Sequence, residues 1–152
     1  MKLHLRSIFM KKTLCIAFLL MLLHSGCYKM KKMGIMKGKW HTYEIFINGG
    51  SLNQMGQILT DFDAKGSYVI YMLDDGAMKG EYYIGDELDY EVWGEWKLES
   101  TEYIYMNIDE FIDGTFLMRN NGEGKYTLYC EDNNVAFYGI GESTMVLELE
   151  RE

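Results

Sequence analysis

Apolar and polar side chains alternate with a period of two in places along the chain after residue 38. The alternation is clearest in two segments, where every second residue is Tyr90, Val92, Gly94, Trp96 and Leu98 in one and Met145, Leu147 and Leu149 in the other. This period predicts half-buried β-strands. Segments of this type, rich in β-branched and aromatic residues, are 40–47, 57–62, 67–73, 80–85, 89–98, 102–108, 114–118, 125–130, 135–141 and 144–150.

Short clusters of Asp, Asn and Gly separate these segments, at residues 48–50, 63–66, 74–76, 113–114, 120–122 and 132–134. Asp-Gly and Asn-Gly pairs allow the positive φ angles that tight hairpins need, so we expect neighbouring strands to be antiparallel. Only residues 51–59, with Leu52, Met55 and Leu59 near helical spacing, suggest a short helix. The pattern predicts one all-β domain.

The beginning of the chain has a different pattern, an unbroken apolar run at residues 14–23 that follows Lys11 and Lys12. A helix of this length covers only about half of a 30 Å bilayer core. A basic start, a short apolar run and small residues before a break are typical of a secretory signal peptide. Met10 is a second candidate start. An uncleaved membrane helix, or an ordinary signal followed by a chance cysteine, stays open as an alternative.

The apolar run ends in Leu23, His24, Ser25, Gly26 and Cys27, which resembles the lipobox of bacterial lipoproteins. In that family the cysteine thiol receives a diacylglyceryl group, carrying chains such as palmitate, and becomes the new N-terminus. The resemblance implies a signal peptide at residues 1–26 and a lipid anchor on Cys27. The following residues, 28–33, lack the acidic run that resembles a surface-export signal. We therefore expect an outer-membrane protein that faces the periplasm, with Gram-positive anchoring as the alternative.

Charge is distributed unevenly along the chain, which has 15 Lys and Arg against 23 Asp and Glu. Four basic residues and no acidic residue lie in 1–26, which leaves 11 basic against 23 acidic residues, a net charge of −12. Beyond Lys39 only 6 basic residues remain against the same 23 acidic ones, a net charge of −17. Residues 27–37 are expected to form a basic tether, either resting on anionic headgroups or simply solvated, before a domain at 38–152. The acidic domain argues against nucleic-acid binding.

Few residues offer nucleophilic or metal chemistry. From residue 27 onward the chain has one histidine, His41, and two cysteines, Cys27 and Cys130. With Cys27 acylated, Cys130 has no disulfide partner, and we expect it to be a small buried apolar residue. Residues 61–66 match the start of a calcium loop, but position 12 is Met72 instead of a bidentate Glu, which favours a hairpin turn. We expect no metal, no cofactor and no enzymatic activity.

Two Gly-x-Trp motifs precede strand-like residues, at 38–40 and 94–96. Glycine permits a close approach or bend of the backbone, and the Trp that follows is expected to close one end of a core. With the lipobox, a hairpin at 61–71 and a last strand at 143–151, this order resembles the lipocalin-like lipoproteins of Bacteroidetes-type bacteria. The resemblance implies a small antiparallel β-barrel of about eight strands that can hold one small ligand in its mouth. An open β-sandwich is the alternative.

Residues 38–152 contain 19 aromatic side chains in 115 residues. Because an eight-stranded barrel is only just wide enough for its own side chains, a self-filled core is favoured over a ligand cavity. The expected function is that of a non-catalytic, membrane-tethered lipoprotein that binds a small hydrophobic ligand. The alternative is a protein interaction or inhibitor module of the envelope, for which Trp93 is the best residue because it faces away from Trp96. A sugar-binding or hydrolytic role ranks last.

Overall fold

The computed structural model describes residues 33–52, 66–108, 111–135 and 141–152. It separates into two compact units, Met1–Ile35 and Met36–Glu152, and all the strands belong to the second. Several predictions lie outside the described residues: the signal peptide, the lipidation site Cys27, most of the proposed helix at 51–59, the strand at 57–62, and the first five residues of the calcium-loop motif.

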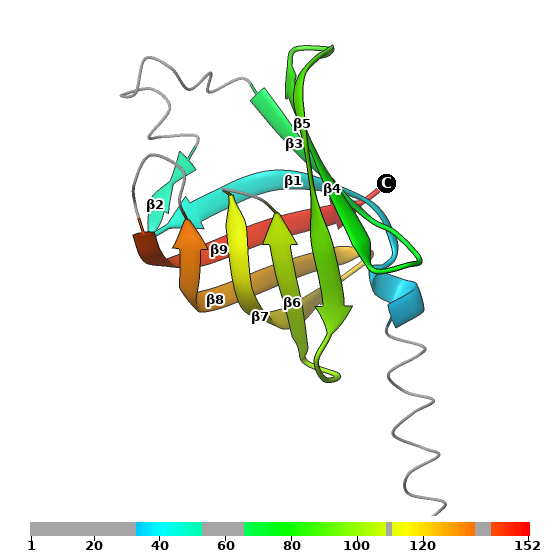
Figure 1. Cartoon of the computed structure of the whole chain (residues 1–152), viewed down its shortest axis with the longest axis vertical. Coiled ribbons are helices and arrows are strands. Elements are labelled where there is room, and N and C mark those ends of the chain that lie inside the picture. The colour runs from blue at the N-terminus through cyan, green and yellow to red at the C-terminus, as the bar shows by residue number, and fades with distance from the viewer. Residues whose placement is uncertain (1–32, 53–65, 109–110, 136–140) are drawn as a thin grey trace, which may run out of the picture. The chain divides into compact units, whose positions relative to one another are not determined.

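The described chain forms nine strands. They are β1 (Gly38–Ile47), β2 (Gly50–Ser51), β3 (Gly66–Met72), β4 (Ala77–Ile84), β5 (Glu87–Leu98), β6 (Tyr103–Ile108), β7 (Ile112–Gly122), β8 (Lys125–Val135) and β9 (Gly141–Arg151). Each of β3 to β8 pairs antiparallel with the next strand in sequence, and β1 pairs with both β3 and β9. The sheet therefore closes into an eight-stranded barrel, with β2 as a short extra strand beside β1 (Figure 1). The all-β barrel is confirmed, and the open β-sandwich is wrong because β1 pairs with strands on both of its sides.

Alternation along the strands places one row of side chains inside the barrel. Met145, Leu147 and Leu149 are fully buried, and Trp96 and Leu98 are nearly so, as the period-two pattern predicts. The interior also contains Phe116, Leu128 and other apolar residues from the remaining strands. Burying a large apolar side chain contributes roughly 1.5–3 kcal/mol, so this continuous core is what holds the barrel closed.

The two Gly-x-Trp tryptophans lie at the same end of the barrel. The indole Nε1 of Trp40 donates to the carbonyl of Met36 at 2.7 Å, and that of Trp96 donates to the carbonyl of Leu73 at 3.0 Å. Both rings are buried and both indole donors are satisfied, so they close this end. The second motif does not open a strand, however, because Gly94 lies in the interior of β5.

Some predicted turns are correct and others are not. Residues 48–49 and 74–76 form turns as expected, with positive φ at Asn48, Gly49 and Gly76. The turn predicted at 120–122 lies two residues later, at 123–124. Residues 113–114 and 132–134 are wrong as turns, since they lie inside β7 and β8.

A bulge explains why these two polar clusters do not turn the chain. The β8–β9 register shifts between Cys130 and Asn133, and the side-chain Oδ1 of Asn133 accepts a hydrogen bond from the backbone N–H of Asp113 at 3.1 Å. The Asn side chain thus supplies an acceptor to the neighbouring strand at the irregular point. A bulge with such a side-chain bond lets residues with turn propensity remain within a strand.

Candidate functional site

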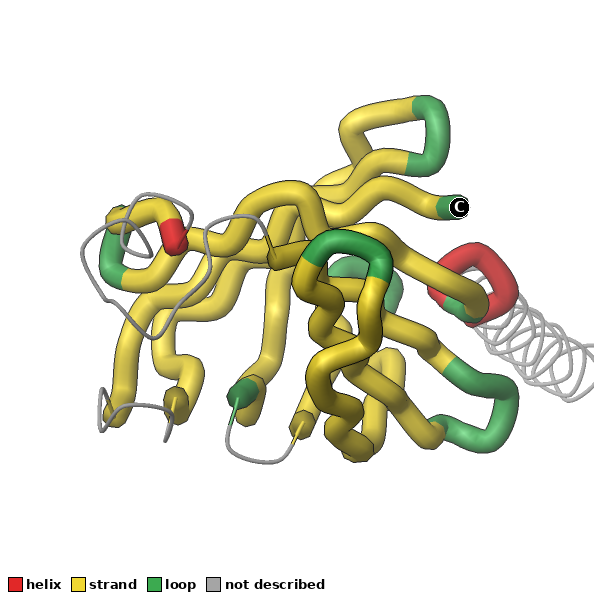
Figure 2. Tube along the Cα trace, turned by 90° about the horizontal axis from the view of Figure 1, so that it is seen from above, coloured by secondary structure: helices red, strands yellow, loops and turns green. Residues whose placement is uncertain are grey.

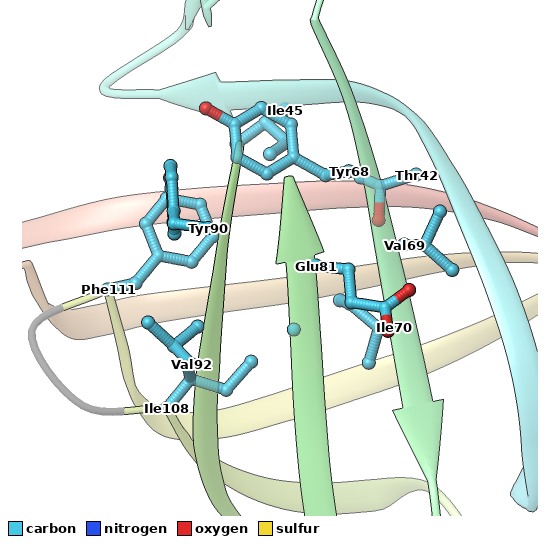
Figure 3. A pocket seen from close by; sticks show the side chains of 11 residues that line it. Thr42, Ile45, Tyr68, Val69, Ile70, Glu81, Tyr90, Val92, Ile108 and Phe111 are labelled. Carbon is cyan, nitrogen blue, oxygen red and sulfur yellow. The ribbon is translucent and has the colours of Figure 1, made fainter. Parts of the chain in front are cut away.

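The barrel contains a cavity of about 270 Å³ at the end opposite the two buried tryptophans. Its lining comes from β1, β3, β4, β5 and β6 and from the residue just before β7 (Figure 3): Thr42, Ile45, Tyr68, Val69, Ile70, Gly80, Glu81, Tyr90, Val92, Ile108 and Phe111. Most of these side chains are apolar. The interior is solid at the tryptophan end and hollow at this end, which we call the mouth, so the prediction of a wholly self-filled core is wrong there.

A glycine stands at an inward position in the lining of the hollow. In the register of the sheet, Gly80 of β4 lies between Ile70 of β3 and Val92 of β5. A methyl group built on Gly80 would lie 3.1 Å from Val92 Cγ2 and 3.4 Å from Ile108 Cδ1. The side chains of Val92 and Ile108 therefore pack closely over the bare backbone of Gly80, and a larger residue here would push them or itself into the cavity.

An aromatic row forms one wall of the mouth. Tyr68, Tyr82 and Tyr90 stand in register on β3, β4 and β5, with ring centroids 4.6 Å and 5.1 Å apart along the row. The ring of Phe111 stacks on Tyr68 at 5.6 Å, nearly parallel to it. Tyr90 is 37% exposed, so the row runs from the interior to solvent. The wall presents an apolar surface with polar hydroxyl tips.

Thr42 is a polar group placed inside this apolar space. Thr42 is only 5% exposed. In the register of the sheet it lies opposite Tyr68 of β3 on one side and Leu149 of β9 on the other. In the close view its hydroxyl oxygen points away from β1, toward the side chains that line the cavity (Figure 3). Within the described part of the chain, Thr42 Oγ1 has no hydrogen-bond partner. Buried hydroxyls are normally paired, so this one requires an explanation.

Glu81 borders the cavity but alternates with Gly80 and Tyr82, which face the interior. Its carboxylate accepts from Lys79 Nζ at 2.5 Å and from the Tyr83 hydroxyl at 2.7 Å. Burial raises the pKa of Glu81, but hydrogen bonds from Lys79, Tyr83 and Tyr71 outweigh this effect and hold its pKa below the usual value. The hydrogen bond between Tyr83 and Glu81 also raises the pKa of Tyr83 to about 12. Glu81 is therefore an ionised, hydrogen-bonded carboxylate, and this arrangement suits a structural role better than proton transfer.

A second hollow, of about 550 Å³, lies over β6, β7 and β8. Leu117 and Tyr129 line it as a cross-strand pair, and they alternate with the buried Phe116 and Leu128. The hollow is therefore on the outer surface of the barrel. Its lining includes the carboxylates of Glu131 and Asp132, so it is less suited to an apolar molecule than the mouth cavity.

The residues singled out in the sequence do not meet at one site. Cys130 is buried, as predicted, and burial raises the pKa of its thiol. Trp93 faces outward as predicted, with 54% of its surface exposed and its indole N–H donating to Glu91 at 2.7 Å. Thr42 and Gly80 were not recognised from the sequence. A polar residue and a glycine at inward positions of alternating strands are the signals that point to them.

The described residues contain no group of three or more His, Cys, Asp and Glu side chains arranged to hold a metal ion. No helix in the described ranges is both long and apolar enough to cross a bilayer.

The view from above shows the strands running around the barrel wall, with the loops gathered at its two ends (Figure 2). The antiparallel order brings the end of β1, the start of β3, the start of β5 and the end of β6 to the mouth, where the cavity lies. No protein family, curated protein or solved structure that was compared with this chain matches it.

Proposed function

We propose that the barrel binds a small hydrophobic ligand in its mouth cavity and has no catalytic role. The observation that carries this proposal is the cavity itself, which is lined mainly by aliphatic and aromatic side chains and borders the partly exposed Tyr90. Ligand sites in proteins are typically concave and mostly apolar, with few polar groups. The mouth fits that description.

The size of the cavity limits the ligand. A volume of about 270 Å³ lies just below the range of roughly 300–1,000 Å³ that is usual for drug-sized ligands. It is well above the roughly 150 Å³ of an engineered apolar cavity that binds benzene. The ligand is therefore larger than one aromatic ring and smaller than a typical lipid with two chains.

We further propose that the barrel is a lipocalin-like lipoprotein, held at the outer membrane by acyl chains on Cys27 and facing the periplasm. The sequence supports this through the lipobox at 23–27 and the basic residues of 27–37, which would lie next to anionic headgroups. One acyl chain anchors a protein only marginally, while two or three hold it stably. A protein held at a membrane by such a tether meets small hydrophobic molecules at high local concentration.

The binding proposal is tested with a fluorescent probe that has an apolar chain and whose emission depends on the polarity of its surroundings. The wild-type chain should increase probe emission in a saturable way, and Gly80→Val should abolish most of this increase because its side chain enters the cavity. Thr115→Val is the matched control: Thr115 is exposed on β7, and its substitution should leave binding unchanged. Equal probe binding by Gly80→Val and the wild type, with both folded by circular dichroism, would count against the mouth as the site.

A second candidate function is supported by the surface of the β4–β5 hairpin. Its exposed apolar side chains include Ile84 (42%), Leu88 (49%) and Trp93 (54%), and acidic residues lie between them. Tryptophan, here Trp93, is among the residue types enriched at binding hot spots. A photo-crosslinking residue at position 93 should capture a specific envelope protein if the hairpin is an interaction surface, and yield no discrete product if it is not.

A further inference from the structure

We propose that the natural ligand is an uncharged molecule with an apolar body and one hydrogen-bonding group, and that Thr42 Oγ1 binds that group. This inference rests on the proposed ligand-binding function and specifies its chemistry. It is carried by two observations that concern the same space: an apolar cavity at the mouth, and a buried hydroxyl that borders it without a partner among the described residues.

Thr42 is the polar group that best explains recognition inside the cavity. A buried hydroxyl without a hydrogen bond lowers stability, whereas valine has nearly the same shape and would lack this cost. A ligand oxygen or amide group in the cavity would complete the hydroxyl's hydrogen bond. The same hydroxyl can donate to a carbonyl and accept from a hydroxyl or an amide, so it suits alcohols, ketones, esters and amides alike.

The charge of the lining argues for an uncharged ligand. None of the described residues that line the cavity is Lys, Arg or His, so among these residues a ligand carboxylate would find no counter-ion. Glu81, the carboxylate among the described lining residues, already accepts from Lys79 and Tyr83, so it is not available to pair with a ligand cation. The rings of Tyr68 and Phe111 stack on each other instead of forming a box, which limits cation–π binding.

The lining also sets the orientation of the ligand. Thr42 lies on one side of the close view, near Val69, while Val92 and Ile108 lie on the opposite side (Figure 3). We infer that the polar group of the ligand lies against β1, and that its apolar body crosses the space above Gly80 toward the aliphatic side chains of β5 and β6.

The test uses three probes with one carbon skeleton: propylbenzene, 3-phenylpropan-1-ol and 3-phenylpropanoate. Each is titrated into the full chain in lipid nanodiscs, and binding is followed by the methyl NMR shifts of the cavity residues Ile45, Ile70 and Ile108. Wild type is compared with Thr42→Val and Thr42→Ser. Partition of a probe into lipid is the same for all three proteins, so the ratio of their dissociation constants depends on the protein alone.

The alcohol should bind Thr42→Val roughly three- to tenfold more weakly than wild type, which corresponds to one neutral hydrogen bond. Propylbenzene should bind Thr42→Val as well as wild type or better, and Thr42→Ser should retain much of the alcohol binding. The carboxylate should bind more weakly than the alcohol to all three. Because valine removes an unpartnered hydroxyl, ligand-free Thr42→Val should melt a few degrees higher than wild type, which also shows that it folds.

Equal effects of Thr42→Val on the alcohol and on propylbenzene would overturn the role of Thr42 while leaving the cavity as a binding site. Tighter binding of the carboxylate than of the alcohol would overturn the uncharged ligand. If none of the three probes shifts the methyl signals of the wild type, the proposed function itself fails.

Discussion

At the scale of single residues, Glu81 shows how this acidic protein accommodates a buried charge. Lys79 bonds its carboxylate, and the ammonium group of Lys79 lies 4.4 Å from the centre of the Tyr71 ring. The Tyr83 hydroxyl donates to the second carboxylate oxygen. Two side chains of its own strand, β4, thus bond the carboxylate, and Tyr71 of β3 lies against the ammonium group of Lys79, which makes the buried charge tolerable.

The sign of the pKa shift at Glu81 predicts acid sensitivity. Since its folded-state pKa is lower than its unfolded value, the cluster stabilises the fold above the usual carboxyl pKa near 4.5 and loses this contribution as the pH falls through the folded-state pKa. Glu81→Gln should lose about 2 kcal/mol of unfolding free energy at pH 7, because the Lys79 bond loses its charged partner. Urea unfolding at pH 7 and pH 3.5 should show a smaller pH dependence for this variant than for wild type.

Glu95→Gln, at an exposed position on β5, is the control and should follow wild type at both pH values. An unchanged pH dependence in Glu81→Gln would show that other carboxylates cause the acid sensitivity.

At the scale of elements, the pairing of β5 with β6 depends on Gly94. A Cβ built on this glycine would lie 1.8 Å from the carbonyl oxygen of Asn107, a backbone atom on β6 that cannot move without breaking the pairing. At Gly80 the nearest atoms are instead the tips of two side chains. The two inward glycines of neighbouring strands therefore do different things: Gly94 allows two backbones to approach, and Gly80 allows side chains to pack on the backbone beside the cavity.

This difference predicts that the same substitution lowers stability far more at Gly94 than at Gly80. Gly94→Ala should lose about 3 kcal/mol of unfolding free energy or fail to fold, because the strands must separate to admit the methyl group. Gly80→Ala should change stability by no more than about 1 kcal/mol, since the loss of glycine flexibility offsets the tight side-chain contact. Thermal unfolding of the two variants measures the difference, and equal stabilities would contradict the close approach at Gly94.

The elements were predictable from the sequence where the signal is local. Period-two alternation identified the inward rows of β5 and β9, and it placed Trp93 and Trp96 on opposite faces. Turn residues at 113–114 and 132–134 were misread because the bulge and the Asn133 side-chain bond that keep them in strands involve partners far away in sequence. The mouth cavity was missed for the same reason, since it needs Thr42, Gly80 and Val92 to meet across three strands.

At the scale of the whole molecule, charge divides the chain into two parts of opposite sign. Beyond Lys39 the net charge is −17, while five lysines lie between residues 29 and 39. Anionic headgroups attract the lysines between residues 29 and 39 and repel the acidic part of the chain beyond Lys39. With acyl chains on Cys27, this arrangement would favour an orientation in which the basic segment contacts the bilayer and the acidic barrel stays in solution.

The anchor predicts a defined chemical product. Mass spectrometry of the native protein should show Cys27 as the N-terminal residue, with the mass of a diacylglyceryl group on it, and membranes should retain the protein in high salt because lipid chains are not screened. Cys27→Ser should lack this modification, and Cys15→Ser should retain it. An unacylated N-terminus or an intact leader on the wild-type protein would contradict the anchor.

The central claim is that the barrel mouth holds an open, apolar space, and xenon measures this most directly, because xenon binds in dry apolar cavities. Crystals of the protein under xenon pressure should show a xenon site among Ile70, Val92 and Ile108 in the wild type and none in Gly80→Val. Closely packed side chains with no xenon between them in the wild type would contradict the account.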